Sequence, residues 1–460
     1  MKRIPVIAML AAMATFLAFA HARSGTANPK TDPKQVAKRA EHQRIQAGGR
    51  NGFVAPTRAN AGNHVATGVD SVAISKTTWA AVEQTTQVLY GAPTPLPSGI
   101  FDGIYALGIN DSGQIIGAGR LSGGPLQPIF WASPTGDPTA LQTGAFSFAA
   151  AQAINNAGQM VGYAGGLQVA LLWSSPNASP TVLPNGGIPF VSAFGINDSG
   201  QIVGFGRQDS ASPHRALFWA SPTSNPIPLH ADFPSSSSII ANDINNAGQI
   251  VGEIVAEANL NVSGPLFWAS STADPEYIKQ GDVSSFPFPF GINDAGQIVG
   301  ISLIPVVWAS PAADPMPLPT GGFIVFNWLG INDAGQIVGT GGTSVGPQTG
   351  LIWTSVPAQI RTLLNSPLFT NLSPQTRNQL GALLNAAAKT LESGNKNAVE
   401  TATNQLGAFI NAVLADYCAN KLTSCQAKQL IDAANGIVVS LGESAFPAES
   451  PCNLPAPSCP

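Results

Sequence analysis

The chain has 460 residues, of which 44% are hydrophobic and only 10% charged, and its formal net charge is −4. The 48 glycines and 38 prolines favour a turn-dense β protein. Residues 71–354 carry 16 acidic and five basic side chains, a formal charge of −11, which disfavours nucleic acid as a partner because phosphate contacts need Lys and Arg.

The first 22 residues have the pattern of a secretory signal peptide. Lys2 and Arg3 precede an apolar stretch from Val6 to Phe19, and Ala20-His21-Ala22 supplies a small-x-small cleavage site. A membrane anchor is the alternative, but the apolar run is short for a span. We therefore expect an exported protein, secreted or periplasmic, with no transmembrane span.

Residues 23–67 form the next segment. Residues 23–60 carry eight Lys or Arg against Asp32 and Glu41, with almost no apolar periodicity. This composition predicts a disordered basic arm.

A nine-residue phrase then recurs six times. It reads Gly-Ile-Asn-Asp-Ser-Gly-Gln-Ile-Ile from Gly108 and changes little in the later copies. Its first asparagines are separated by 45, 42, 48, 48 and 39 residues: Asn110, Asn155, Asn197, Asn245, Asn293 and Asn332. A period in this range predicts an array of identical supersecondary units.

Each repeat contains four short segments. The first ends in Ile-Asn, a turn with glycine follows, and the second is Gln-Ile-Val-Gly or similar. The third closes on a tryptophan, as in Leu217-Phe218-Trp219, and the fourth is proline-rich, so it should be an outer edge strand. Four strands in about 40–50 residues are typical of a β-propeller blade, with a parallel β-helix as the main rival.

The number of blades depends on the residues before the first phrase. Val88-Leu89-Tyr90 and Pro95-Leu96-Pro97 resemble third and fourth strands, and Gly68-Val69-Asp70-Ser71 resembles a worn phrase. We therefore expect a propeller over residues 68–365 with seven blades, the first degenerate. Six blades closed by an overlapping terminal strand are the alternative.

The residue after the first asparagine is acidic or an amide in every copy. We expect these residues to form a ring on one rim and to cap the backbone of their own turns, with Ca²⁺ binding as the alternative: Asp111, Asn156, Asp198, Asn246, Asp294 and Asp333. The sequence predicts no metal ligands and no cofactor.

Loop lengths indicate where a ligand binds. The distance from each tryptophan to the next phrase is nearly constant, so length variation concentrates between the second and third strands. Those loops share a face with the connection to the next blade, which carries aromatic residues. We predict that these bind ligand: Phe101, Tyr105, Phe146, Phe148, Phe190, Phe286, Phe288, Phe323 and Trp328. Packing between blades is the alternative, and it is expected for Phe194 and Phe290.

The sequence predicts no catalytic residues. Gly342-Thr343-Ser344-Val345-Gly346 matches the serine-hydrolase pattern, but it lies in a blade loop and nothing positions His214 or His230 beside Ser344. We expect a monomeric, non-catalytic binding or scaffold protein that recognises a glycan or a protein. An extracellular hydrolase or lyase acting on a polysaccharide is the alternative.

After Thr354 the apolar period becomes helical. Ser373-Pro374 begins the first of three amphipathic helices, which end at Gly442, so residues 372–442 should form a small bundle. The four cysteines lie in and after it: Cys418, Cys425, Cys452 and Cys459. In an exported chain they indicate disulfides, and the local pairs 418–425 and 452–459 cost least loop closure. Residues 443–460 should be an irregular tail.

The repeats resemble the HAF family of extracellular repeats, on the Gly-Ile-Asn-Asp-Ser-Gly-Gln phrase and on His214-Arg215-Ala216-Leu217-Phe218-Trp219. The helical segment resembles a FIMAH domain, on the stretch from Gln405 to Val413 and on Leu422-Thr423-Ser424-Cys425. That family usually has glycine where Cys425 stands. Both resemblances imply secreted bacterial modules without established catalytic activity.

Overall fold

The computed structural model describes residues 90–446, apart from 123, 166–168, 232, 234, 257–262, 282–286, 344–346 and 393–396. The segments predicted to be the signal peptide and the basic arm, and the tail with Cys452 and Cys459, lie outside the described residues. Within the described part no helix is long and apolar enough to cross a membrane.

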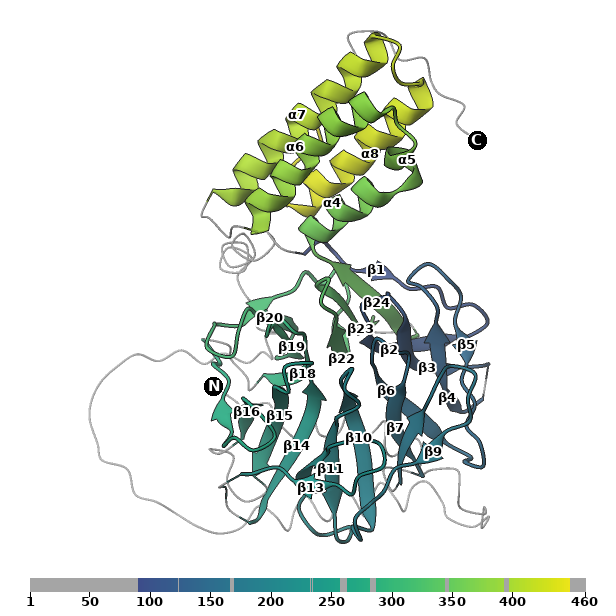
Figure 1. The fold of residues 1–460 in the computed structure, drawn as a ribbon, viewed down its shortest axis with the longest axis vertical. Coiled ribbons are helices and arrows are strands. Elements are labelled where there is room, and N and C mark those ends of the chain that lie inside the picture. Colours follow the sequence, from purple (N-terminus) through teal and green to yellow (C-terminus); the bar gives the residue numbers. More distant parts are fainter. Residues whose placement is uncertain are drawn as a thin grey trace, which may run out of the picture. The chain divides into compact units, whose positions relative to one another are not determined.

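The described strands form six antiparallel sheets of four strands each (Figure 1). Blade 1 contains β2 (Gly103–Ile109), β3 (Ile115–Arg120), β4 (Leu126–Trp131) and β5 (Thr139–Ala140). Blade 2 contains β6 (Ala149–Ile154), β7 (Met160–Ala164), β8 (Val169–Trp173) and β9 (Thr181–Val182). Blade 3 contains β10 (Phe190–Ile196), β11 (Ile202–Arg207), β12 (Arg215–Trp219) and β13 (Ile227–Pro228).

The remaining blades follow the same order. Blade 4 contains β14 (Ser237–Ile244), β15 (Ile250–Ala256), β16 (Gly264–Trp268) and β17 (Glu276–Tyr277). Blade 5 contains β18 (Phe288–Ile292), β19 (Ile298–Ile301), β20 (Pro305–Trp308) and β21 (Met316–Pro317). Blade 6 contains β22 (Val325–Ile331), β23 (Gln336–Gly342), β24 (Thr349–Thr354) and, as its outer strand, β1 (Thr94–Pro95).

The preference for seven blades is wrong. The segment around Leu96 does not belong to a blade of its own, because Thr94 pairs with Ile352 and Pro95 with Leu351 of the last repeat. An N-terminal strand therefore completes the blade that the end of the repeat array begins. Such a closure hides the sheet edges that an open array would expose.

The first strand of every blade contacts the first strands of its two neighbours, so the ring closes on itself. These first strands surround the ring axis, and the fourth strands, two residues long, lie outermost. The proline-rich segment was predicted to be an outer edge, and this is confirmed for the strands around Pro228 and Pro317.

Glycine is required at two places in each repeat. The turn glycine has a positive φ in every copy, as at Gly113 (φ 75°). The glycine that ends Ile-Val-Gly faces a bulge in the first strand: a Cβ on Gly162 would lie 1.9 Å from the carbonyl oxygen of Ala150. Only glycine fits against a backbone at that distance.

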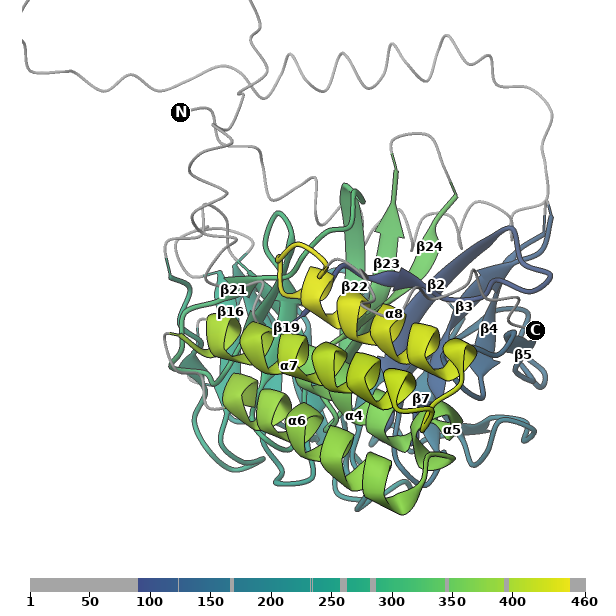
Figure 2. The same ribbon diagram turned by 90° about the horizontal axis from the view of Figure 1, so that it is seen from above.

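The helical part consists of α4 (Val356–Asn365), α5 (Pro367–Thr370), α6 (Pro374–Glu392), α7 (Ala398–Cys418) and α8 (Ser424–Ser440). α4 lies within the range 68–365 that the sequence assigned to the propeller, yet Val356, Ile360 and Leu363 are buried in the helical core. The three expected helices, α6, α7 and α8, lie side by side (Figure 2), so the structure adds α4 and α5 to the predicted bundle.

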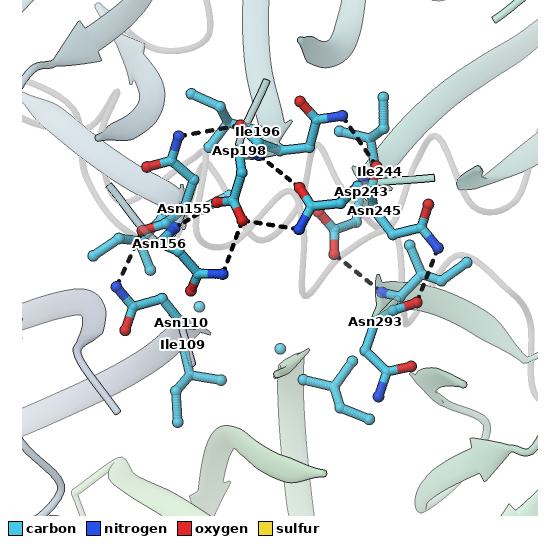
Figure 3. Close-up of a pocket in the computed structure, with 18 of the residues that line it drawn as sticks. Ile109, Asn110, Asn155, Asn156, Ile196, Asp198, Asp243, Ile244, Asn245 and Asn293 are labelled. Atoms are coloured by element: carbon cyan, nitrogen blue, oxygen red, sulfur yellow. Dashed lines mark hydrogen bonds between the residues drawn. The ribbon is translucent and has the colours of Figure 1, made fainter. Parts of the chain in front are cut away.

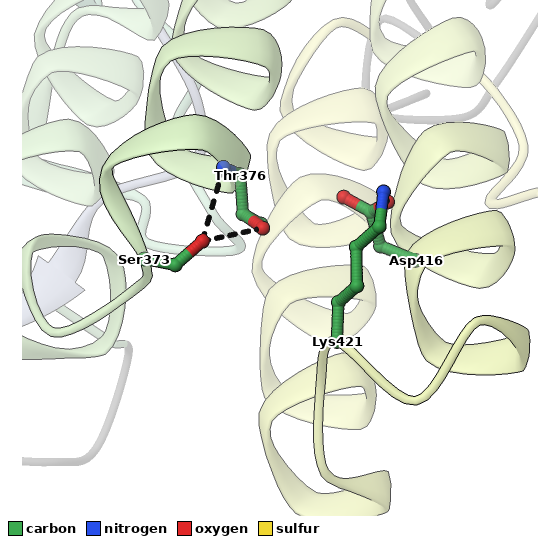
Figure 4. Close-up of polar contacts among 4 residues, drawn as sticks. All are labelled: Ser373, Thr376, Asp416 and Lys421. Carbon is green, nitrogen blue, oxygen red and sulfur yellow. Dashed lines mark hydrogen bonds and ion pairs between the residues drawn. The ribbon is translucent and has the colours of Figure 1, made fainter.

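Polar contacts fix the ends of these helices (Figure 4). The hydroxyl of Ser373 accepts a hydrogen bond from the Thr376 amide at 3.2 Å, which confirms the predicted N-cap. Lys421, in the corner between α7 and α8, pairs with the buried carboxylate of Asp416 at 2.8 Å. The corner is therefore anchored by an ion pair beside the cysteines.

Candidate functional site

Two belts of hydrogen bonds surround the opening of the ring on the face that carries the Asn-Asp turns, here called the turn face, and Figure 3 shows part of them. In the inner belt, the side-chain Nδ2 of each first asparagine donates to the carbonyl of the next one at 2.9–3.2 Å, and Asn332 donates to Asn110. The Oδ1 of each asparagine accepts a hydrogen bond from the backbone amide of the glutamine in its own turn at 2.8–3.0 Å. One residue therefore shapes its own turn and binds the next blade.

The outer belt consists of the acidic or amide residues that follow. The backbone amide of each donates to the side-chain oxygen of its counterpart in the next blade at 2.7–2.8 Å, and Asp333 closes the circle onto Asp111. The expectation that these side chains cap their own turns is therefore wrong. The ring brings each side chain close to the following turn, which the sequence could not show.

The outer belt alternates charge over part of its length. The amide of Asn156 donates to the carboxylates of Asp111 and Asp198, and Asn246 donates to those of Asp198 and Asp294. No amide separates Asp294, Asp333 and Asp111. Burial, followed by the repulsion from Asp111 and Asp294, raises the pKa of Asp333 to about 6.

A polar pocket opens inside the belts, with an empty volume, including the part open to solvent, of about 620 Å³. Below it, the lining consists of the residue before each phrase, together with one tryptophan: Leu107, Gln152, Phe194, Asn242, Phe290, Leu329 and Trp328. We call these two connected spaces the axial channel. None of its lining residues, all within the described part, is Lys, Arg or His.

Asp243 is the exception to the repeat inside the channel, because the other copies begin with Gly or Ala at this position. Its carboxylate accepts hydrogen bonds from the amides of Ile244 at 2.9 Å and Ile292 at 3.0 Å. Burial raises its pKa to about 7, although these two hydrogen bonds lower it. Asp243 is thus a carboxylate held in the channel wall between blades 4 and 5.

Asn242 precedes Asp243 and is 5% exposed. Its Nδ2 donates to the carbonyl of Pro289 at 2.7 Å, its buried Oδ1 has no hydrogen-bond partner in the described structure, and the residue lines the deep part of the channel. A buried oxygen without a donor is costly and calls for a ligand or a water.

Aromatic rings form the apolar part of the channel. Trp328 lies 5.0 Å from Phe290 and 5.9 Å from Phe194 between ring centroids. Blade 6 places its bulge at Trp328 itself, whose φ of 51° is rare for a bulky residue. The strained backbone at Trp328 inserts its side chain into the channel.

The predicted ligand-binding aromatics do not form one exposed surface. Phe101 is buried at 4% exposure, and Trp328 lines the channel. Phe146 and Tyr105 pack against the core shared by blades 1 and 2, and the ring of Phe148 lies 6.3 Å from that of Tyr163 between centroids, tilted by 47°. Phe286 lies outside the described residues. The other three predicted residues are half-buried: Phe190, Phe288 and Phe323.

No nucleophile is placed beside a base among the described residues. Ser344 lies outside them. His214 packs against Phe205, and burial followed by the charge of Arg207 lowers the pKa of His214 to about 4. His230 forms an ion pair with Asp274. The described residues also contain no cluster of three or more His, Cys, Asp or Glu suited to a metal ion.

Asn242, Asp243 and Glu253 were missed by the sequence reasoning. Glu253 is 3% exposed in the position that Tyr163 and Phe205 occupy in other blades, and burial raises its pKa to about 7. The available signal was the departure of the fourth repeat from the shared pattern. Cys418 and Cys425 are both disulfide-bonded, but which cysteine each one pairs with stays a prediction.

Comparison with known proteins assigns this chain neither a family nor an activity. No known family model matches the chain, and no curated protein matches it. A gluconolactonase from Xanthomonas campestris shares 12% identity over 58% of this chain and 97% of that chain, with a TM-score of 0.40. A TolB protein from Agrobacterium tumefaciens shares 13% identity over 58% and 82%, with a TM-score of 0.30. Neither similarity assigns an activity, and the fold is that of a six-bladed β-propeller.

Proposed function

We propose that this protein is an exported, non-catalytic binding protein that captures a protein partner on the face opposite the turn face, called here the loop face. The observation that carries the proposal is an exposed apolar sector over three consecutive blades, 5, 6 and 1. Leu303 is 58% exposed, Ile324 62% and Leu121 39%. We call these three residues the apolar sector.

The topology places the apolar sector on the loop face. Leu303 lies between β19 and β20, and Leu121 lies between β3 and β4. The amide of Ile324 bonds to the carbonyl of Gly342 at the end of β23, where the loop to β24 begins. Apolar side chains gathered on one face are typical of an interaction surface.

The side-chain chemistry favours a protein over a glycan. Glycan recognition relies on flat aromatic faces, but the predicted aromatics within the described residues are buried or half-buried. The exposed residues of the sector are branched aliphatic chains, which suit apolar anchors of a protein interface. The resemblance of the repeats to HAF proteins is consistent with an extracellular role, although no family model matches.

The test compares two charged double variants of the mature chain. Leu303→Asp with Ile324→Asp alters the apolar sector. Val182→Asp with Ile227→Asp alters two residues of the outer strands, 58% and 54% exposed, and is the matched control. We expect cell-surface extract to yield one captured protein with wild type and with the control, at least tenfold less with the sector variant, and no glycan retained on an array.

Three results would contradict the proposal. Equal loss of capture in both variants would place the interface elsewhere. Retention of a glycan that the sector variant still binds would favour a carbohydrate ligand. Turnover of a polysaccharide by the purified chain would favour the hydrolase or lyase alternative.

A further inference from the structure

The axial channel combines features that act on one kind of ligand. Its mouth carries four aspartates of the outer belt: Asp111, Asp198, Asp294 and Asp333. Asp243 lines the same pocket as these aspartates, and Asn242, whose Oδ1 has no hydrogen-bond partner in the described structure, lines the space below it. We propose that the channel binds a small aliphatic ammonium ion, with the cationic head beside Asp243 and Asn242 and its carbon chain against Trp328 and Phe290.

The channel supplies hydrogen-bond acceptors for the ammonium head. The hydrogen bond from Asn242 to Pro289 occupies the side-chain amide donor, and the Oδ1 of this channel-lining residue stays without a partner among the described residues. Asp243 holds its carboxylate with two backbone amides, and each oxygen keeps a further lone pair. An ammonium group brings three donors and a positive charge, which matches both groups.

The channel also has an aromatic wall that can attract a cation. The ring centroid of Trp328 lies 5.0 Å from that of Phe290 and 5.9 Å from that of Phe194. A cation over an aromatic face is attracted by the ring quadrupole, and Trp is the strongest such partner. A bulky residue at a positive φ is strained, and such strain gathers at functional positions.

A hard metal ion fits the channel less well than an organic cation. Ca²⁺ takes six to eight oxygen ligands at short range. The deep part of the channel offers few oxygens, because Leu107, Leu329 and the three rings supply most of its wall. The missing coordination therefore disfavours Ca²⁺, and the apolar wall favours the carbon chain of an organic cation.

The experiment uses the mature full-length chain with n-butylammonium chloride as the probe and n-butanol as its uncharged match. We expect millimolar binding of the ammonium ion by calorimetry, with at least tenfold weaker binding of butanol. The indole N–H signal of Trp328, identified with Trp328→Phe, should shift in nitrogen-proton spectra. A parallel measurement uses lysine amide acetylated on its α-amine, which keeps the side-chain ammonium group. Its affinity, compared with that of butylammonium, distinguishes a lysine side chain of a protein from a free amine as the ligand.

The repeats themselves supply variants that the ring tolerates. Asn242→Leu introduces the residue that Leu107 and Leu329 place at the same position, and Asp243→Asn removes the charge at constant size. We expect each to weaken butylammonium binding about tenfold. Asp198→Asn introduces the asparagine that Asn156 and Asn246 provide at the equivalent position of other repeats. This variant changes only the mouth of the channel and should weaken butylammonium binding at most about threefold.

Several outcomes would overturn the assignment. They are equal binding of butanol, an unchanged Trp328 signal, or a wild-type affinity in both Asn242→Leu and Asp243→Asn. Displacement of butylammonium by stoichiometric Ca²⁺ would assign the channel to a metal ion. If the variants do not fold, the comparison of the two probes on the wild-type chain still decides the question.

Discussion

At the scale of single residues, the repeated side chains form hydrogen bonds from one blade to its neighbour. Trp219 illustrates this: it is fully buried, and its Nε1 donates to the carbonyl of Pro184 beside the preceding blade at 2.7 Å. The other five third-strand tryptophans make the same bond at 2.7–2.9 Å. These tryptophans therefore link neighbouring blades in addition to packing inside their own blade.

Glu253 should lower the stability of the propeller as the pH rises. Its folded pKa of about 7 lies above the ordinary value of 4.5, so the folded state holds a proton that the unfolded chain has lost. Stability from this group is present near pH 4.5 and is lost as the pH approaches 7. Asp243 and Asp333, whose pKa values are also raised, act in the same direction.

Glu253→Gln should remove that loss. We expect the free energy of unfolding of the variant to equal that of wild type near pH 4.5. At pH 8 it should be higher than that of wild type by up to about 3 kcal/mol. Urea unfolding followed by tryptophan fluorescence does not report on the helical part, because all eight tryptophans precede residue 354. Glu276→Gln, at an exposed site on β17, is the control. A difference independent of pH would contradict the assignment.

At the scale of elements, the corner between α7 and α8 gathers several local devices. α8 begins with a capping box in which Thr423 and Gln426 bond each other's backbone amides. Asn420 adopts a positive φ of 55° in the turn before it. Cys418 is the last residue of α7, and Cys425 lies in the first turn of α8.

A disulfide between Cys418 and Cys425 should therefore hold this corner. Peptide mapping without reduction is expected to show the pairs 418–425 and 452–459. Replacing both Cys418 and Cys425 by alanine should lower the stability of the helical part by about 2–3 kcal/mol, measured from the far-ultraviolet helix signal. A 418–459 link, or free thiols at these positions, would contradict the local pairing.

At the scale of the whole molecule, every blade boundary carries the same three kinds of hydrogen bond. The boundary between blades 6 and 1 has them as well: Asn332 to Asn110, Asp333 to Asp111 and Trp131 to Pro97. The chain crosses this boundary as it crosses the others, from the outer strand β1 of blade 6 to β2 of blade 1, and the break in chain continuity lies inside blade 6, between β24 and β1. Closure therefore depends on six units of the right curvature.

Deleting residues 195–242 removes one full repeat and leaves five blades. The curvature of the remaining boundaries should leave a gap with exposed sheet edges, so we expect aggregation and loss of the cooperative melt. Light scattering after size-exclusion chromatography measures this, with the Val182→Asp variant as a monomeric control. A monomeric deletion variant with an unchanged melt would contradict a closed ring of six.

The sequence by itself determined the architecture of the repeat. Spacing between asparagines, the positive-φ glycine and the tryptophan-terminated strand all depend on local backbone geometry, so four strands per blade and an outer fourth strand followed from the pattern. The N-cap at Ser373 followed in the same way. These features are encoded within about 45 residues, and each copy repeats the evidence.

Tertiary structure alone decided what the blades form together. The sequence showed that Pro95-Leu96-Pro97 resembles a fourth strand but not to which blade it belongs, and its pairing with the last repeat decided for the six-bladed alternative with an overlapping terminal strand. The cross-blade partners of Asp111 and the channel position of Trp328 also appeared only on closure. Both the belts and the axial channel arise from residues about 40 positions apart or more, because a ring brings corresponding positions of different repeats around one axis.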